Sequence, residues 1–267
     1  MAQVRVLIVR APGTNCDQET AYAFEQAGAV AEVAHVNRLL ESPGWSDQFQ
    51  VLCFPGGFSY GDDVAAGRIV AVQLRHHLTD ALTRFRDAGK LVLGICNGFQ
   101  ILIKSGLLLP DLPQQGAPAT LTWNQSGRFE DRWVHLAVTS SKSVFLRGIE
   151  RMYLPIAHAE GQFITHDAAV MAQLEEQGQL VLRYTPGDHS LPVTGAAHAG
   201  TLPFPVNPNG SQANVAGLCD ATGRVFGLMP HPERHIDPTQ HPQWTRRREQ
   251  PVADGLQIFR NAVGYFA

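Results

Sequence analysis

Three short, almost wholly apolar runs in the N-terminal part constrain the fold of this chain more than any other feature. They read VRVLIV (4–9), VLCFP (51–55) and KLVLGI (90–95). A strand that helices cover on both faces needs no alternation of polar and apolar residues, so such runs are typical of a parallel sheet. Helix-like patterns between them predict a doubly wound α/β fold, with helices on both faces of a mostly parallel sheet.

Two helices are expected between these strands. The first runs from Asp17 to Ala27 and ends at Gly28, because glycine commonly terminates a helix. The second has apolar side chains three or four residues apart, which is the spacing of one helix face. These side chains, which precede Gly89, are Val70, Leu74, Leu78, Leu82 and Phe85.

The C-terminal half departs from this pattern. Four later runs are typical of antiparallel or mixed strands, and they span 133–138, 152–158, 180–184 and 215–230. The last predicts a hairpin that turns at Ala-Thr-Gly. We expect these strands to extend the sheet or to cover one of its edges, as antiparallel additions to the α/β fold.

Length predicts a single domain over 1–267, since 267 residues are enough for one large core. Turn-forming residues gather near 186–204 and 236–252. Both segments are predicted to be surface insertions rather than linkers between domains.

Charge and cysteine content exclude several classes of function. The formal net charge is −3 and the basic residues are scattered apart from a short run at 246–249, so no nucleic acid is expected as a partner. Apolar runs are too short for a signal-peptide core or a membrane span, which predicts a cytoplasmic protein without membrane contact. The four cysteines form no CxxC pair, so we expect free thiols and no metal site. Cys53 and Cys219 lie inside strand-like runs and are expected to be buried structural thiols.

The segment KLVLGICNGFQIL (90–102) places Cys96 between a strand and a helix that begins near Asn97. Glycines at 94 and 98 allow the sharp turn of a nucleophile elbow, which presents the nucleophile at the end of a strand. The helix N-terminus stabilises a thiolate, the form that attacks a carbonyl carbon. Cys96 is therefore the predicted nucleophile.

The segment LMPHPERH (228–235) offers a base and a residue that orients it. His231 and Glu233 are two positions apart, so an extended backbone would place both side chains on the same side. Together with Cys96 they are predicted to form a Cys-His-Glu triad. His231 would take the thiol proton and later protonate the leaving amine, while Glu233 would hold the imidazole in the required tautomer.

A glycine-rich turn, FPGGFSYGDD (54–63), follows the second apolar run. The backbone N–H of Gly57 and that of Asn97 are the predicted donors of an oxyanion hole. The same glycines do not form a dinucleotide motif, and AGKL at 88–91 is not a Walker sequence, so no nucleotide cofactor is expected on this chain.

Six motifs together resemble those of the glutaminase (small) subunits of phosphoribosylformylglycinamidine synthase, a family of triad (class I) glutamine amidotransferases. They are PGTNCDQET (12–20), PGGFSYGDD (55–63), GICNGFQIL (94–102), PIAHAEGQF (155–163), NPNGS (207–211) and GLMPHPER (227–234). The resemblance follows the same order along nearly the whole chain.

The resemblance implies that the substrate is L-glutamine, whose side-chain amide is hydrolysed at Cys96 through a glutamyl thioester. Ammonia would then pass to a large synthase subunit, which binds ATP and Mg and makes the amidine of formylglycinamide ribonucleotide in de novo purine biosynthesis. A small third subunit is a further candidate partner. The resemblance also implies that Gly56 and Gln100 line the glutamine pocket, with His158 and Glu160 as further candidates.

Other functions remain open at this point. The chain could serve an anthranilate- or guanylate-type amidotransferase, act as a stand-alone cysteine hydrolase of related fold, or be a catalytically idle interaction subunit. The HPE motif weighs against the idle subunit, while NPNGS and PGTNCD weigh against the hydrolase.

Overall fold

The computed structural model describes residues 3–110, 117–187, 200–246 and 253–267, and its centre is a nine-stranded mixed sheet. The strands follow the order β2-β1-β3-β4-β11-β10-β9-β6-β7. From β2 to β11 neighbouring strands are parallel, and from β11 to β7 they are antiparallel. The expected α/β fold with antiparallel additions is confirmed, and the later strands extend the sheet.

The parallel half consists of β2 (Val30–His35), β1 (Arg5–Arg10), β3 (Val51–Phe54), β4 (Leu91–Ile95) and β11 (Val225–Leu228). Every residue of β3, β4 and β11 is buried, which explains the unbroken apolar runs. The edge strand β2 was not predicted. It is only partly buried and reads VAEVAH, so it has no comparable run.

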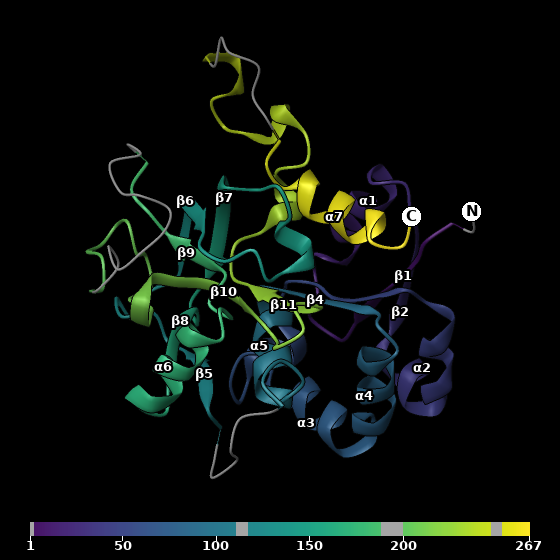
Figure 1. The fold of residues 1–267 in the computed structure, drawn as a ribbon. Coiled ribbons are helices and arrows are strands. Elements are labelled where there is room, and N and C mark those ends of the chain that lie inside the picture. Colours follow the sequence, from purple (N-terminus) through teal and green to yellow (C-terminus); the bar gives the residue numbers. More distant parts are fainter. Residues whose placement is uncertain (1–2, 111–116, 188–199, 247–252) are drawn as a thin grey trace.

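Helices cover both faces of the parallel half (Figure 1). On one face lie α1 (Asp17–Gln26) and α7 (Leu256–Gly264), whose Phe24 and Phe259 rings meet edge to face at 4.9 Å. On the other lie α3 (Arg68–His77), α4 (Thr79–Asp87) and α5 (Asn97–Ser105). A short helix, α2 (Val36–Glu41), follows β2 directly.

The single helix expected before Gly89 is wrong, because two helices, α3 and α4, meet there. Leu78 leaves the helical region with φ −123° and ψ 1°, and the Thr79 hydroxyl donates to the Arg75 carbonyl at the end of α3. The apolar side chains on both sides of the break are nevertheless buried. Val70 and Leu74 of α3, and Leu82 and Phe85 of α4, are all buried.

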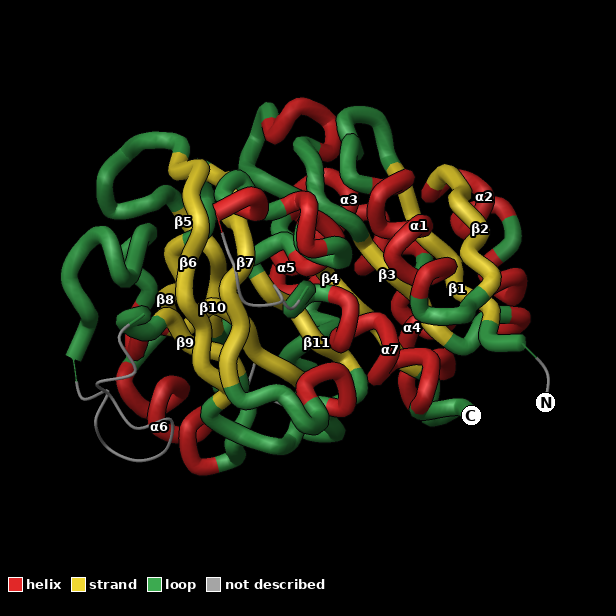
Figure 2. The backbone as a smooth tube through the Cα atoms, turned by 90° about the horizontal axis from the view of Figure 1, so that it is seen from above, coloured by secondary structure: helices red, strands yellow, loops and turns green. Residues whose placement is uncertain are grey.

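The antiparallel half consists of β10 (Val215–Cys219), β9 (Leu182–Tyr184), β6 (Glu130–Val138) and β7 (Arg151–His158). The predicted hairpin is confirmed, since β10 pairs antiparallel with β11 and Gly223 takes the left-handed conformation in the turn between them. Beside this half lie a small sheet of β5 (Ala119–Thr122) and β8 (Gln162–Thr165), and the helix α6 (Ala168–Glu176). Figure 2 shows β1 and β2 at one end of the molecule and β6 and β7 at the other.

Much of each predicted insertion lies outside the described residues, namely 188–199 and 247–252. The described remainder of the second insertion, 236–246, contains two short 3-10 turns and projects from the body beside α7 (Figure 1). Among the helices that the structure describes, none combines the length and the apolarity that crossing a bilayer requires.

Candidate active site

Cys96 lies on a strained turn between β4 and α5. Its φ of 51° and ψ of −105° are unusual for a residue with a side chain, and strain of this kind is typical of a nucleophile elbow. The flanking glycines make the turn sterically feasible. A Cβ at Gly98 would lie 1.8 Å from the Phe54 carbonyl oxygen, and one at Gly94 would lie 2.7 Å from the Gly98 carbonyl oxygen. The predicted elbow is therefore present.

The Cys96 side chain faces a cavity of about 230 Å³. The thiol is 5% exposed, and its Sγ lies 3.8 Å from the Ala157 carbonyl oxygen, to which it donates. Three segments line the cavity together with Trp123, and they are 57–66, 96–100 and 157–160. This volume suits a small polar substrate, and its walls include most of the predicted pocket residues.

The predicted base and its orienting residue lie next to each other. His231 Nδ1 and Glu233 Oε1 are 2.6 Å apart, and both side chains are buried. Only His231 is extended, however, because 232–234 forms a 3-10 turn whose first position is proline. The expectation of a fully extended segment is wrong, but the turn still places the carboxylate on the imidazole.

The surroundings of His231 favour its protonated form. Burial is the largest single effect and disfavours the charge, but several nearby groups together outweigh it and raise the pKa of His231 well above the usual value. Glu233 contributes most to this rise, followed by the thiols of Cys96 and of a second cysteine, Cys16. Cys96, His231 and Glu233 therefore interact as one group.

The turn that is predicted to supply an oxyanion donor lies at the end of β3. Gly57 faces Thr14 in an antiparallel bridge, and this bridge is held by the Phe58 N–H, which donates to the Gly13 carbonyl at 2.9 Å. Gly57 has φ 141°, and a Cβ there would lie 2.7 Å from the Asn15 backbone nitrogen, so no other residue fits without strain.

The two predicted oxyanion donors are available. Within the described part of the chain, the Gly57 N–H has no hydrogen-bond partner. Asn97 opens α5, and N–H groups in the first turn of a helix have no partner inside that helix.

Gln100 lines the pocket, and the Asn97 side chain supports it from the same helix. Asn97 accepts from the Ser59 N–H at 3.2 Å and donates from Nδ2 to Gln100 Oε1 at 2.9 Å. Gln100 in turn donates to the Glu160 carbonyl. Both amides therefore connect α5 with the turn after β3 and with the segment after β7.

His158 and Glu160 both lie at the pocket, in different states. Burial lowers the pKa of His158 to about 3, so its ring is neutral, and Nδ1 lies 3.1 Å from Asn124 Oδ1. The Glu160 carboxylate accepts from the Ala66 N–H and pairs with Lys104 at 3.6 Å. In the described part of the chain, His158 Nε2 has no hydrogen-bond partner, whereas the Glu160 carboxylate already binds protein groups.

Sequence reasoning missed two residues at this site. Asp62 lines the cavity, and burial raises the pKa of its carboxyl to about 6. Its position in the glycine-rich turn was a signal that could have drawn attention to it. Cys16 lies against His231, but the two residues are far apart in the sequence, and spacing alone could not have paired them.

Nearly the whole chain matches known glutamine amidotransferases. Residues 3–266 match the family model of the CobB/CobQ-like glutamine amidotransferase domain. The subunit PurQ of phosphoribosylformylglycinamidine synthase from Dehalococcoides mccartyi is 47% identical over 98% of this chain and 98% of that protein. The chain belongs to this family of glutamine amidotransferases. The family predicted from the motifs is thereby confirmed, and so is the predicted class of enzyme.

Solved structures agree with this placement. The structure of PurLQS from Thermotoga maritima matches all of this chain and all of the compared chain, with a TM-score of 0.73 and 29% identity. A glutamine amidotransferase from the same organism matches 98% of this chain and 99% of its own, with a TM-score of 0.56. At 16% identity, the second match supports the fold of the family alone.

One group of side chains in this amidotransferase has the donor set of a metal site. Ligand atoms of Cys16, His231 and Glu233 all lie within 4.8 Å of one another, and a thiol, an imidazole and a carboxylate are ligands that zinc accepts. These donors are already engaged, however, because His231 and Glu233 bond to each other and the Arg234 guanidinium donates to the sulfur at 3.1 Å. The three side chains therefore form a hydrogen-bonded group rather than a set of free metal ligands.

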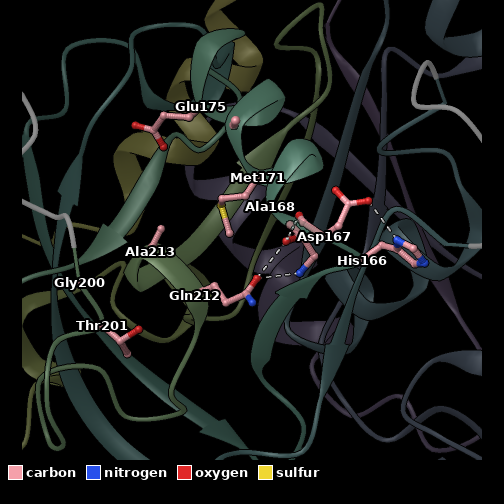
Figure 3. A pocket seen from close by; sticks show the side chains of 11 residues that line it. His166, Asp167, Ala168, Met171, Glu175, Gly200, Thr201, Gln212 and Ala213 are labelled. Atoms are coloured by element: carbon pink, nitrogen blue, oxygen red, sulfur yellow. Dashed lines mark hydrogen bonds and ion pairs between the residues drawn. The ribbon is translucent and has the colours of Figure 1, made fainter.

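A larger hollow of about 630 Å³ lies elsewhere, between the start of α6 and residues 200–213 (Figure 3). Among the described residues that line it, the only histidine is His166, which is exposed and pairs with Asp167. The same described lining contains no cysteine and no member of the predicted triad. The predicted nucleophile thus faces the smaller cavity and not this hollow.

Proposed function

We propose that this chain is the glutaminase subunit of a phosphoribosylformylglycinamidine synthase, and that it hydrolyses glutamine at Cys96. One observation carries the residue assignment: a cysteine on a strained elbow interacts electrostatically with His231, which forms a buried pair with Glu233 whose bonded atoms are 2.6 Å apart. The name of the full-length relative supports the choice of synthase over an anthranilate- or guanylate-type enzyme.

The reaction begins with proton transfer from Cys96 to His231. The thiolate attacks the side-chain carbonyl carbon of glutamine, and a sulfur–carbon bond forms. Glu233 holds the Nδ1 proton of the imidazole, so that Nε2 faces the reacting atoms. The negative charge of the Glu233 carboxylate also stabilises the imidazolium that this transfer creates.

The tetrahedral intermediate places negative charge on the former carbonyl oxygen. The N–H groups of Gly57 and Asn97 would donate to this oxygen, and a preformed donor costs no reorganisation during the reaction. The carbon–nitrogen bond then breaks, and His231 gives its proton to the departing nitrogen, which leaves as ammonia. The product on the enzyme is a glutamyl thioester at Cys96.

Water completes the cycle. His231, now neutral, takes a proton from water, and the hydroxide attacks the thioester carbon. The sulfur–carbon bond breaks, glutamate leaves, and the proton returns to Cys96. Each role of His231 is a proton transfer at Nε2, which is buried and has no hydrogen-bond partner among the described residues.

The ammonia requires an acceptor on another polypeptide. The chain carries no recognised nucleotide-binding motif, so ATP and Mg would be bound by a large synthase subunit, and a small third subunit would complete the assembly. The relative from Dehalococcoides mccartyi is named as a subunit of the synthase, and the similar structure from Thermotoga maritima is that of PurLQS. Both names support such a complex. We place this complex in the cytoplasm, where its purine precursors are made.

Two surfaces are candidates for docking the large subunit. Phe58 and Trp123 line the cavity at Cys96 and are 43% and 59% exposed, which is unusual for aromatic side chains. The projecting segment 236–246, with Trp244 half exposed, is the second candidate. The first lies where ammonia must leave, so we place the acceptor subunit there and assign a supporting contact to the segment.

The experiment is a glutaminase assay of the chain alone, with the large subunit, and with the large subunit plus ATP and formylglycinamide ribonucleotide. The rate should rise with each addition, since uncoupled hydrolysis would waste ammonia and the partner would favour the competent Gly56–Gly57 turn. Full activity in the isolated chain, unchanged by these additions, would favour an independent hydrolase.

A further inference from the structure

Cys16 is a second thiol at the reacting centre, and the mechanism above gives it no role. It precedes α1 and is 1% exposed. Its Sγ donates to Asn15 Oδ1 at 3.2 Å and accepts from Arg234 Nη2 at 3.1 Å. A side chain this well connected holds its position firmly.

The backbone of Cys16 holds the oxyanion turn. Its N–H donates to the Gly56 carbonyl oxygen at 3.2 Å. Gly56 C=O and Gly57 N–H belong to one planar trans peptide and therefore point in opposite directions. By binding the carbonyl on one side, Cys16 directs the Gly57 N–H toward the other, where the oxyanion would form.

The side chain of Cys16 reaches the catalytic base. A Cβ placed on Gly56 would lie 2.7 Å from His231 Cε1 and 3.0 Å from Cys16 Sγ, so the two side chains close over Gly56 and approach each other there. The ligand atoms of Cys16 and His231 lie within 4.8 Å of each other, and the nearby thiol favours protonated His231. Residue 16 thus contacts both the oxyanion turn and the base.

We propose that Cys16 is a positioning residue of the glutaminase site, which ties the Gly56–Gly57 turn to His231. This inference rests on the proposed function. The backbone N–H of Cys16 orients the Gly57 N–H, which is the oxyanion donor. The Cys16 thiol contacts the imidazole of His231, which transfers the proton. A shift of either partner is then transmitted to the other.

Arg234 and Glu19 extend this connection. Arg234 Nε donates to Glu19 Oε1 at 3.1 Å while its Nη2 binds Cys16, so the turn after His231 is fastened to α1 at two points. Both ends of this ion pair are about one-third exposed, so the contact with the buried sulfur matters more for position than the ion pair does.

Thiol chemistry keeps Cys16 distinct from the nucleophile. Burial raises the pKa of the Cys16 thiol, although its contact with His231 partly opposes this effect. At neutral pH the residue therefore stays a neutral thiol and leaves the imidazolium free to pair with Cys96. An ionised Cys16 would compete with Cys96 for the same proton.

The test compares Cys16→Ala and Cys16→Ser in the assembled synthase with Cys219→Ala, which removes an equally buried thiol from β10. Cys16→Ala should lower glutamine-dependent kcat about tenfold and leave KM within about threefold, because the geometry of the reacting groups is loosened. The alkaline limb of the pH–rate profile of Cys16→Ala should move to lower pH, since a contact that favours protonated His231 is lost. Cys16→Ser, which keeps a hydrogen-bonding atom, should fall between this variant and wild type.

Two outcomes would overturn the proposal. One is a Cys16→Ala profile that matches wild type in kcat and pH dependence. The other is a loss equal to that of Cys219→Ala with an unchanged pH profile, since that pattern reports a packing defect. Ammonia-dependent synthesis by the same complexes shows that they are assembled. Failure of the proposed function would instead appear as normal glutamine turnover by Cys96→Ala.

Discussion

The two halves of the sheet contribute different things to the same cavity. Under the proposed function, the parallel half supplies the reacting groups, because Cys96 follows β4, Gly57 follows β3 and His231 follows β11. The antiparallel half supplies wall residues, among them His158 at the end of β7. We propose that the chemistry belongs to the parallel half, and that the antiparallel half contributes to the fit of the substrate together with wall residues such as Gln100. Substitutions in the two halves should therefore change different kinetic constants.

The largest effect is expected at Cys96. Cys96→Ala should abolish glutamine-dependent synthesis by the complex, because no sulfur–carbon bond can form. Synthesis from added ammonia should continue at the wild-type rate, since the acceptor subunit is intact. Cys53→Ala and Cys219→Ala, at thiols buried inside strands, are the controls and should retain activity.

The second-largest effect is expected at His231, the proposed base, which follows β11. His231→Ala should slow thioester formation by at least about a hundredfold, the lower end of what a positioned acid–base group provides. Glu233→Gln should fall between this variant and wild type, since it keeps the side-chain shape and loses the charge. Rapid-quench measurement of the thioester provides both rates. Wild-type rates in His231→Ala would place the base elsewhere.

A smaller and different effect is expected from the antiparallel half. His158→Ala should raise the KM for glutamine about three- to tenfold and leave kcat within about threefold, because His158 shapes the cavity without reacting. The pKa of about 3 means that His158 is neutral throughout the working range. The pH profile of the variant should therefore coincide with that of wild type between pH 5 and 9. A fall in kcat as large as that of His231→Ala would break the division between the two halves.

The smallest effect concerns stability. The carboxyl of Asp62 has a pKa raised from 3.8 to about 6, so the folded state keeps its proton longer than the unfolded chain as the pH rises. This contribution to stability is present below about pH 4 and is lost as the pH passes 6. The free energy of unfolding should therefore decrease between pH 4 and 7, and Asp62→Asn should make this decrease smaller by about 1 kcal/mol, after allowance for the partial exposure of Asp62. Denaturant unfolding at both pH values measures it.

The same division explains what the sequence could predict. Strands β3 and β4 were predictable because burial on both faces leaves only apolar residues, and the elbow was predictable because Cys96 is flanked by two glycines. Strand β2 was not, since an edge strand with partly exposed residues shows no such run. The break at Leu78 depends on packing against other elements, which local spacing does not record.

Within the site, local pairs were predictable and distant ones were not. His231 and Glu233 are neighbours in the sequence, and their shared role follows from spacing. Cys16 and Arg234 are 218 residues apart, and only the fold brings them together. The pKa of Asp62 likewise depends on burial and on nearby groups such as Glu160, which come from other elements.

The most direct test of the central claim is the identity of the residue that carries the glutamyl group. The complex is mixed with glutamine, quenched in acid during turnover, digested and analysed by mass spectrometry. We predict a glutamyl thioester on the peptide that contains Cys96, and none on those with Cys16, Cys53 or Cys219. Turnover of glutamine with no modification of Cys96, or with the glutamyl group on another thiol, would contradict the account.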